Sequence, residues 1–179
     1  MTVFNLPNSI TFVRIVILPV FVIAMVYKRY DAALALFVIA SISDALDGMM
    51  ARMTNQKTTL GAFLDPLADK ILMTTSFIMF SVFGLAPTWL TITVISRDLI
   101  VTVGWFLLYM IYNISKIEPL LTGKAANASQ LILIAYILFS INLNTDSTPQ
   151  PWMLWVVASL TIVSGCQYIY RGLRQASDK

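Results

Sequence analysis

The sequence predicts an all-α integral membrane protein with six transmembrane helices. Hydrophobic residues make up 58% of its 179 residues, only 12% are charged, and the mean hydropathy is +0.79. A soluble domain has roughly a quarter of its residues charged. Apolar stretches of the length that a helix needs to cross a bilayer recur along the chain and are separated by short polar breaks. We expect residues 1–179 to form a single membrane domain.

The six expected spans follow from hydropathy and from ordinary loop signals between them. Charged, Gly, Pro, Asn, Asp and Ser residues mark the breaks "KRYD", "MTNQKTT", "GLAP", "NISKIEPLLTG" and "NTDSTPQP". The predicted spans are 9–28, 32–52, 60–83, 87–112, 125–143 and 151–170.

Basic residues are distributed unequally between the two sides of this arrangement. With the N-terminus in the cytoplasm, the outer loops hold only Lys28 and Arg29. The inner loops and the tail hold Arg52, Lys57, Lys116, Lys124, Arg171, Arg174 and Lys179. This asymmetry fits the positive-inside rule. It predicts that both termini face the cytoplasm, in a protein that we assign to the bacterial inner membrane.

The composition excludes several kinds of site. The chain has no histidine and one cysteine, Cys166, so it can form neither a Cys/His zinc site nor an internal disulfide. A metal site would have to use oxygen ligands, which suit Mg²⁺, Mn²⁺ or Ca²⁺. The net charge of +3 is not gathered in a basic cluster, so we expect no nucleic-acid partner.

Four of the nine acidic residues lie close together in the sequence. Asp44 and Asp47 are three residues apart, and Asp65 and Asp69 are four apart. On helices, each pair would share one face. The short break between the two predicted helices makes them antiparallel neighbours, so the four carboxylates are expected to converge in a polar cavity open to the cytoplasm.

Four carboxylates in a low-dielectric setting cannot all stay ionised without compensation. They could be protonated, as in a proton relay, or they could bind divalent cations. Four oxygen donors suit one or two hard cations, and paired metals are a known arrangement for phosphoryl displacement. A purely structural role is disfavoured, because acidic residues inside apolar segments are costly and are functional by default.

Small and basic residues accompany the acids. Gly48 and Ala51 lie beside Asp47, and Gly61 lies one turn before Asp65. Taken singly, such residues more often indicate close helix packing. Together with Arg52, whose planar guanidinium suits phosphate, they indicate a pocket for metal and a phosphorylated ligand.

In order, these residues read D-x-x-D-G-x-x-A-R, eight residues, then G-x-x-x-D-x-x-x-D. The pattern resembles the signature of the CDP-alcohol phosphotransferases at all eight positions, and the six-span plan is similar across nearly the whole chain. The resemblance implies an enzyme that displaces CMP from a CDP-linked lipid or alcohol and joins the phosphoryl group to an acceptor hydroxyl. It also implies a homodimer.

The resemblance also implies roles for individual residues. Asp44, Asp47 and Asp65 are expected to bind divalent metal, Mg²⁺ or Mn²⁺ and two ions in all. Asp69 is expected to be the general base and to share in metal binding. The expected CDP site is formed by Asp47, Gly48, Ala51, Arg52 and Gly61.

Residues 5–19, "NLPNSITFVRIVILP", resemble the N-terminal pattern of phosphatidylglycerophosphate synthases, which use CDP-diacylglycerol as donor. That branch implies glycerol 3-phosphate as acceptor, with Arg97 and Lys124 binding its phosphate. Arg14 either joins them or serves only as a topology anchor. Because Arg97 and Asp98 are adjacent on a helix, we expect them to have different partners, with a structural ion pair as the alternative.

Three features depart from that branch. Asp98 stands where glutamate is typical, no basic residue follows it in the fourth span where another arginine is usual, and Ala126 stands where a second lysine is usual. Fewer cations suit a dianionic phosphate monoester less well. The pair Arg97–Asp98, with Lys124 and Asn127, also resembles the cardiolipin synthases, whose acceptor is phosphatidylglycerol. Phosphatidylglycerophosphate synthase is the preferred interpretation, and cardiolipin synthase is the alternative.

Two other classes of protein remain open on the sequence. A transporter would also carry intramembrane acids, but its acids would lie near the midplane and its halves would show a repeat. A lipid-binding scaffold would not need the complete acidic set. Metal-dependent release of CMP would separate the enzyme from both.

Overall fold

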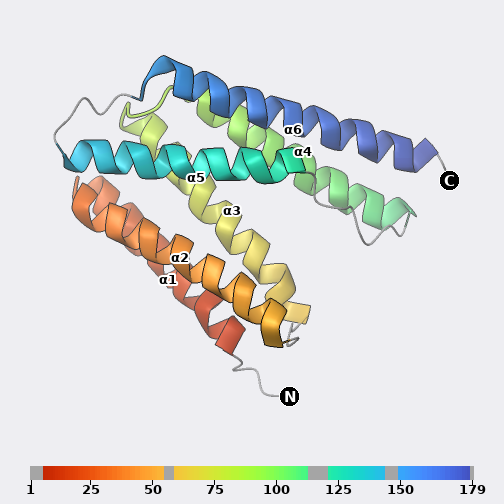
Figure 1. The fold of residues 1–179 in the computed structure, drawn as a ribbon, viewed down its shortest axis with the longest axis horizontal. Helices are drawn as coiled ribbons and strands as arrows, with labels where there is room; N and C mark the ends of the chain where they lie inside the picture. The colour runs from red at the N-terminus through yellow and green to blue at the C-terminus, as the bar shows by residue number, and fades with distance from the viewer. Residues whose placement is uncertain (1–5, 55–58, 113–120, 144–148, 178–179) are drawn as a thin grey trace. The chain divides into compact units, whose positions relative to one another are not determined.

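The computed structural model describes residues 6–54, 59–112, 121–143 and 149–177, which form six helices (Figure 1). The side chains of 6–15 and 44–69, and some near 105–112 and 175–177, lie outside this description. The helices are α1 (Leu6–Val26), α2 (Tyr30–Thr54), α3 (Thr59–Val82), α4 (Thr88–Tyr112), α5 (Leu121–Asn142) and α6 (Pro151–Ser177).

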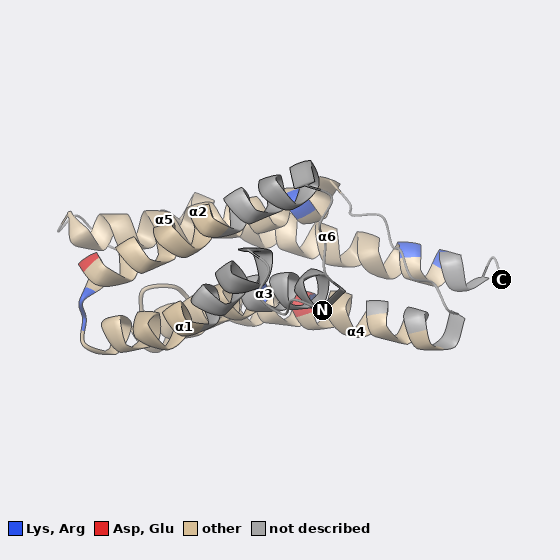
Figure 2. Ribbon diagram, turned by 90° about the horizontal axis from the view of Figure 1, so that it is seen from below, with Lys and Arg blue, Asp and Glu red and all other residues tan. Residues whose placement is uncertain are grey.

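The expected all-α class and the six helices are confirmed. Within the described residues, α5 and the Pro151–Arg174 part of α6 are long and apolar enough to cross a membrane. Shorter apolar helical stretches are Val16–Val26, Tyr30–Ser43 and Lys70–Val82. Most of the length of the described helices carries no charged side chain (Figure 2). That all six helices span the membrane, and that the chain is one domain, stay predictions.

The chain divides into two compact units. The first comprises Met1–Met79 and Ala135–Ser147, and the second comprises Phe80–Ile134 and Thr148–Lys179. The first unit therefore holds α1, α2, most of α3 and the end of α5. The second unit holds α4, α6 and the beginning of α5.

In the first unit, a tight turn brings α2 back against α1 (Figure 1). Lys28 takes a left-handed backbone conformation, with φ of 54°, and the Arg29 amide donates to the Ala24 carbonyl at 2.8 Å. This closes the end of α1. Beside this turn, Asn142 of α5 donates its side-chain amide to the carbonyl of Tyr30, the first residue of α2, at 3.0 Å. The described buried apolar side chains of this unit are Phe21, Ala24, Met25, Ala33, Phe37, Ala40, Leu72, Met73, Phe77, Ile137 and Leu138.

In the second unit, α4 packs against α6. Buried residues recur every three or four positions on these helices, as expected when one stripe of each helix faces its neighbours. The buried apolar residues of α4 to α6 in this unit are Leu90, Val94, Ala126, Leu133, Ile134, Val157 and Ala158. The same stripes carry buried polar residues, namely Thr91, Arg97, Asp98, Gln130, Thr161 and Ser164. A polar centre therefore lies inside an apolar bundle.

Candidate active site

The acidic motif lies on two consecutive helices of the first unit. Asp44 and Asp47 belong to α2, and Asp65 and Asp69 belong to α3. Only residues 55–58 separate the two helices, and Figure 1 shows α3 running back in the direction opposite to α2. The structure confirms that both pairs lie on helices, where residues three or four apart share a face.

The contacts of the motif residues stay predictions. The side chains of the four aspartates and of Gly48, Ala51, Arg52 and Gly61 lie outside the described residues, as does that of Arg14 on α1. Their expected roles in binding metal, CDP and acceptor phosphate are therefore proposals.

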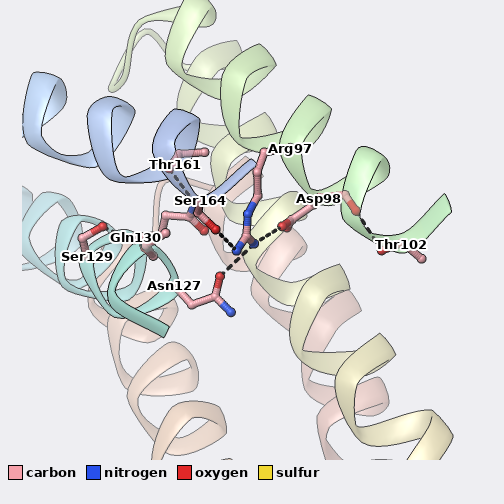
Figure 3. A network of polar contacts seen from close by, with 9 residues as sticks. Arg97, Asp98, Thr102, Asn127, Ser129, Gln130, Thr161 and Ser164 are labelled. Atoms are coloured by element: carbon pink, nitrogen blue, oxygen red, sulfur yellow. Dashed lines mark hydrogen bonds and ion pairs between the residues drawn. The ribbon is translucent and has the colours of Figure 1, made fainter. Parts of the chain in front are cut away.

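Arg97 of α4 is the centre of a buried polar cluster in the second unit (Figure 3). Its exposed fraction is 5%. Its Nη1 donates to Asp98 Oδ1 at 2.7 Å and to Asn127 Oδ1 at 3.1 Å. Its Nη2 donates to Ser164 Oγ at 2.8 Å, and its guanidinium lies over the Tyr168 ring, 5.8 Å from the centroid. We call Arg97, Asp98, Asn127, Ser164 and Tyr168 the Arg97 cluster.

The expectation that Arg97 and Asp98 would have different partners is wrong. They form a 2.7 Å ion pair whose side chains are 6% and 11% exposed. Helical geometry separates the Cβ atoms of adjacent residues, but the long arginine side chain can turn its guanidinium back to the neighbouring carboxylate. A buried charge is costly unless it is paired and hydrogen-bonded, so the ion pair also explains how Arg97 can be buried.

Two glycines lie beside Arg97, and one of them, Gly123, leaves room for this arrangement. A Cβ on Gly123 would lie 3.2 Å from Arg97 Nη2 and 3.3 Å from Tyr168 Cε2. A Cβ on Gly165 would lie 3.4 Å from Arg97 Cγ. A side chain at position 123 would crowd both the cation and the ring beneath it, so this glycine helps to set where the guanidinium sits.

The first turns of α5 carry the other predicted acceptor residues. Lys124 is exposed, whereas Ala126 is completely buried. A lysine at position 126 would therefore have to be accommodated in a packed position. Alanine at position 126 therefore fits the packing of α5, and it also leaves the site with one positive charge fewer than a second lysine would give.

The cavity formed by described residues lies elsewhere in the second unit. It has a volume of about 580 Å³ and lies where α4 and α6 begin. Its lining includes Trp89 and Trp155, whose rings are tilted by 32° with their centroids 5.3 Å apart. No charged residue lines it. It is not the polar cavity that the sequence predicts, and that cavity stays a prediction.

Sequence reasoning missed the α6 half of the cluster. Ser164, Gly165 and Tyr168 were not singled out, although Ser164 and Tyr168 are polar residues in an apolar helix at helical spacing. Polar residues in membrane helices commonly hydrogen-bond across to other helices. That signal could have identified the face of α6, but it could not have named Arg97 as the partner, which is 67 residues away in the sequence.

Comparison with known proteins finds similarity over nearly the whole chain. The sequence profile of the CDP-alcohol phosphatidyltransferase family matches residues 4–163. The match includes the complete acidic motif and ends just before Ser164 and Tyr168.

Individual relatives are similar over comparable lengths. A Bacillus subtilis (strain 168) protein named CDP-diacylglycerol–glycerol-3-phosphate 3-phosphatidyltransferase is 36% identical over 183 residues, covering 92% of this chain and 93% of the relative. A probable phosphatidylglycerophosphate synthase of Mycobacterium tuberculosis is 34% identical over 177 residues, covering 95% and 82%. A cardiolipin synthase (CMP-forming) of Rattus norvegicus is 30% identical over 182 residues, covering 93% and 60%.

Proposed function

The chain belongs to the CDP-alcohol phosphatidyltransferase family, and on that basis we propose that it makes phosphatidylglycerophosphate. The reaction transfers the phosphatidyl group of CDP-diacylglycerol to the hydroxyl of glycerol 3-phosphate and releases CMP. The observation that carries this proposal is the complete eight-position motif on the helical segments of α2 and α3. The names of the B. subtilis and M. tuberculosis relatives support the choice of acceptor.

The donor set of the motif fits a divalent cation. The two aspartates of each pair lie about one turn apart on the helical backbone of α2 or α3, and the chain offers no histidine that would favour zinc. Asp44, Asp47, Asp65 and Asp69 would hold Mg²⁺ or Mn²⁺, two ions in all. When bound, such ions neutralise the pyrophosphate and the leaving CMP.

The chain's own residues then account for binding and proton transfer. Arg52 binds phosphate oxygens of the CDP group with its planar guanidinium, and Asp47, Gly48, Ala51 and Gly61 complete that site. Asp69 takes the proton of the acceptor hydroxyl. The hydroxyl oxygen bonds to the phosphorus that bears diacylglycerol, the phosphoanhydride bond breaks, and its electron pair leaves with CMP.

The acceptor phosphate is assigned to basic residues outside the motif. Arg97 and Lys124, with Arg14, would bind it. In its observed position, Arg97 cannot offer all of its hydrogen-bond donors to the phosphate. Three of the five N–H donors of the arginine already bond to Asp98, Asn127 and Ser164. Two donors remain for phosphate oxygens.

Cardiolipin synthesis is the second candidate, and the balance of charge in the described residues favours it. The negative charge of Asp98 offsets the positive charge of Arg97, and position 126 holds a buried alanine where a lysine would add a positive charge. The net positive charge of Arg97, Asp98 and Lys124 therefore comes from Lys124. One net positive charge suits the phosphodiester of phosphatidylglycerol better than a dianionic monoester. The similarity to the rat cardiolipin synthase supports this alternative.

We also propose that the protein spans the bacterial cytoplasmic membrane with all six helices and works as a homodimer. The active site would open to the cytoplasm, where both termini would lie. The acyl chains of the donor would stay in the bilayer while its CDP group enters a polar cavity. The excess of basic residues in the expected inner loops supports this orientation.

The identity of the acceptor can be tested by analysing the products. Purified protein in detergent–lipid micelles is given CDP-diacylglycerol and Mg²⁺ or Mn²⁺, with glycerol 3-phosphate or phosphatidylglycerol in separate reactions. CMP and lipid products are identified by mass spectrometry. We expect phosphatidylglycerophosphate and an equal amount of CMP in the first reaction. Product in the second reaction alone would assign the protein as a cardiolipin synthase, and no CMP release in either would reject both assignments.

A further inference from the structure

The guanidinium of Arg97 is held in place by four neighbouring residues. Asp98 and Asn127 accept from Nη1, Ser164 accepts from Nη2, and Tyr168 lies against its face. These partners come from α4, α5 and α6 (Figure 3). A long side chain with many rotamers is thereby fixed in a single orientation.

One donor of this fixed group is left over. Arg97 Nε is buried and has no hydrogen-bond partner among the described residues. A buried unsatisfied donor is costly, and more so on a charged group. Most buried polar atoms have a partner, so a buried cationic N–H without one indicates an acceptor that binds there. A phosphate oxygen is such an acceptor and forms a charge-assisted hydrogen bond with arginine.

We propose that Ser164 and Asn127 are positioning residues that hold Arg97 so that its Nε–H and the remaining Nη2 N–H donate to the phosphate of the acceptor. The proposal rests on the proposed function and adds residues of α5 and α6 to it. Neither residue touches the reacting atoms. They act by restricting Arg97, so their loss should weaken acceptor binding and leave the chemical step largely unchanged.

The chain offers a matched control on the same face of α6. Thr161 lies three residues before Ser164, is also completely buried, and accepts a 3.0 Å hydrogen bond from Gln130 Nε2. Among the described residues, it is not hydrogen-bonded to Arg97. Thr161→Val therefore removes one buried interhelical hydrogen bond from α6, as Ser164→Ala does, without removing a partner of Arg97.

The kinetic experiment measures KM for each substrate and kcat in wild type, Ser164→Ala, Ser164→Thr and Thr161→Val. A hydrogen bond to a charged group is worth enough to change affinity roughly tenfold. We expect Ser164→Ala to raise the acceptor KM about tenfold, with kcat and the KM for CDP-diacylglycerol within about twofold of wild type. Ser164→Thr, which keeps the hydroxyl, should restore the acceptor KM, and Thr161→Val should not change it. An unchanged acceptor KM in Ser164→Ala, or an equal rise in Thr161→Val, would overturn the proposal.

A binding measurement separates failure of this inference from failure of the proposed function. The rise in melting temperature on adding glycerol 3-phosphate or inorganic phosphate is measured for the same purified variants. We expect a rise in wild type and Thr161→Val that is lost in Ser164→Ala. If wild type transfers no phosphatidyl group but this pattern holds, the proposed function fails and the phosphate site stands. Equal rises in wild type and Ser164→Ala, or no rise in wild type, would reject the site.

Discussion

The acid-bearing segments of α2 and α3 and the Arg97 cluster are both polar regions in an apolar chain, but their residues are grouped in different ways. The aspartates lie three or four residues apart on helices that only residues 55–58 separate. Two partners of Arg97 lie 30 and 67 residues away from it in the sequence. A helical repeat can be read from spacing along the chain. Contacts between distant helices are known only once the helices have been placed.

The comparison also separates two contributions to one proposed reaction. The first region carries the aspartates that we propose to hold metal and to accept a proton. The second carries a cation whose orientation is set by three helices of one unit. Changes in the first region should therefore reduce turnover with any acceptor, and changes in the second should alter the affinity for the acceptor.

The largest expected effect is that of Asp69→Asn in the first region. An amide cannot accept the proton of the acceptor hydroxyl, and loss of a general base costs about 10²–10⁴-fold in rate. We expect CMP release to fall at least about 100-fold with either acceptor, measured by chromatography of CMP.

The control for this change is Asp31→Asn, which alters the same residue type at an exposed position. It should keep the wild-type rate. Near-normal turnover of Asp69→Asn with metal bound would remove Asp69 from the role of general base.

A smaller effect is expected at Gly123 in the second region. The Cβ of an alanine there would crowd Arg97 Nη2 and Tyr168 Cε2, at 3.2 and 3.3 Å. At Gly104 of α4, nothing described lies within 4 Å of the added Cβ. Alanine is favoured over glycine inside a helix by roughly 0.5–1 kcal/mol, so Gly104→Ala should raise the melting temperature.

Gly123→Ala should not gain that stability and should raise the acceptor KM several-fold, since the guanidinium must shift. The two measurements are thermal unfolding in detergent and steady-state kinetics. Equal stabilisation of the two variants, with wild-type acceptor KM in both, would mean that Gly123 does not constrain the Arg97 cluster.

The smallest effect is expected for the ion pair at the α1–α2 turn, outside both regions. The hydrogen bond from the Arg29 guanidinium, followed by one from the Ala32 amide, lowers the pKa of the Asp31 carboxyl. A lowered pKa in the folded state means that the ionised carboxylate stabilises the fold at neutral pH. This contribution is lost as the pH falls through the lowered pKa.

Both partners are well exposed, at 68% and 63%, so solvent screening leaves little of this contribution. Asp31→Asn should lower the melting temperature slightly at pH 7 in low salt. The difference should vanish in high salt and at acidic pH. A large destabilisation that persists in high salt would indicate a different role for Asp31.

The helices could be predicted closely because apolar stretches of about twenty residues are unmistakable. The third span, predicted as 60–83, is Thr59–Val82. The errors have physical causes. The last span was predicted to end at residue 170, but α6 continues to Ser177. Hydropathy marks where a helix becomes polar, and a helix can continue with Arg171 and Arg174 on it.

The fifth span illustrates a second kind of error, with a consequence for the site. It was predicted to start at residue 125, since Gly123 and Lys124 are typical of a loop, but α5 starts at Leu121. Gly123 lies in the first turn of the helix, where its lack of a side chain makes room for Arg97. A glycine needed for packing against a distant residue cannot be distinguished by sequence from a glycine that breaks a helix.

The most direct test of the account is the dependence of CMP release on divalent metal. Wild-type protein is treated with EDTA, freed of chelator, and assayed with CDP-diacylglycerol and glycerol 3-phosphate while Mg²⁺ or Mn²⁺ is titrated back. We predict no CMP release without metal, and release that rises with metal and requires the acceptor. Release that persists after chelation, or that proceeds equally well without an acceptor, would contradict the account.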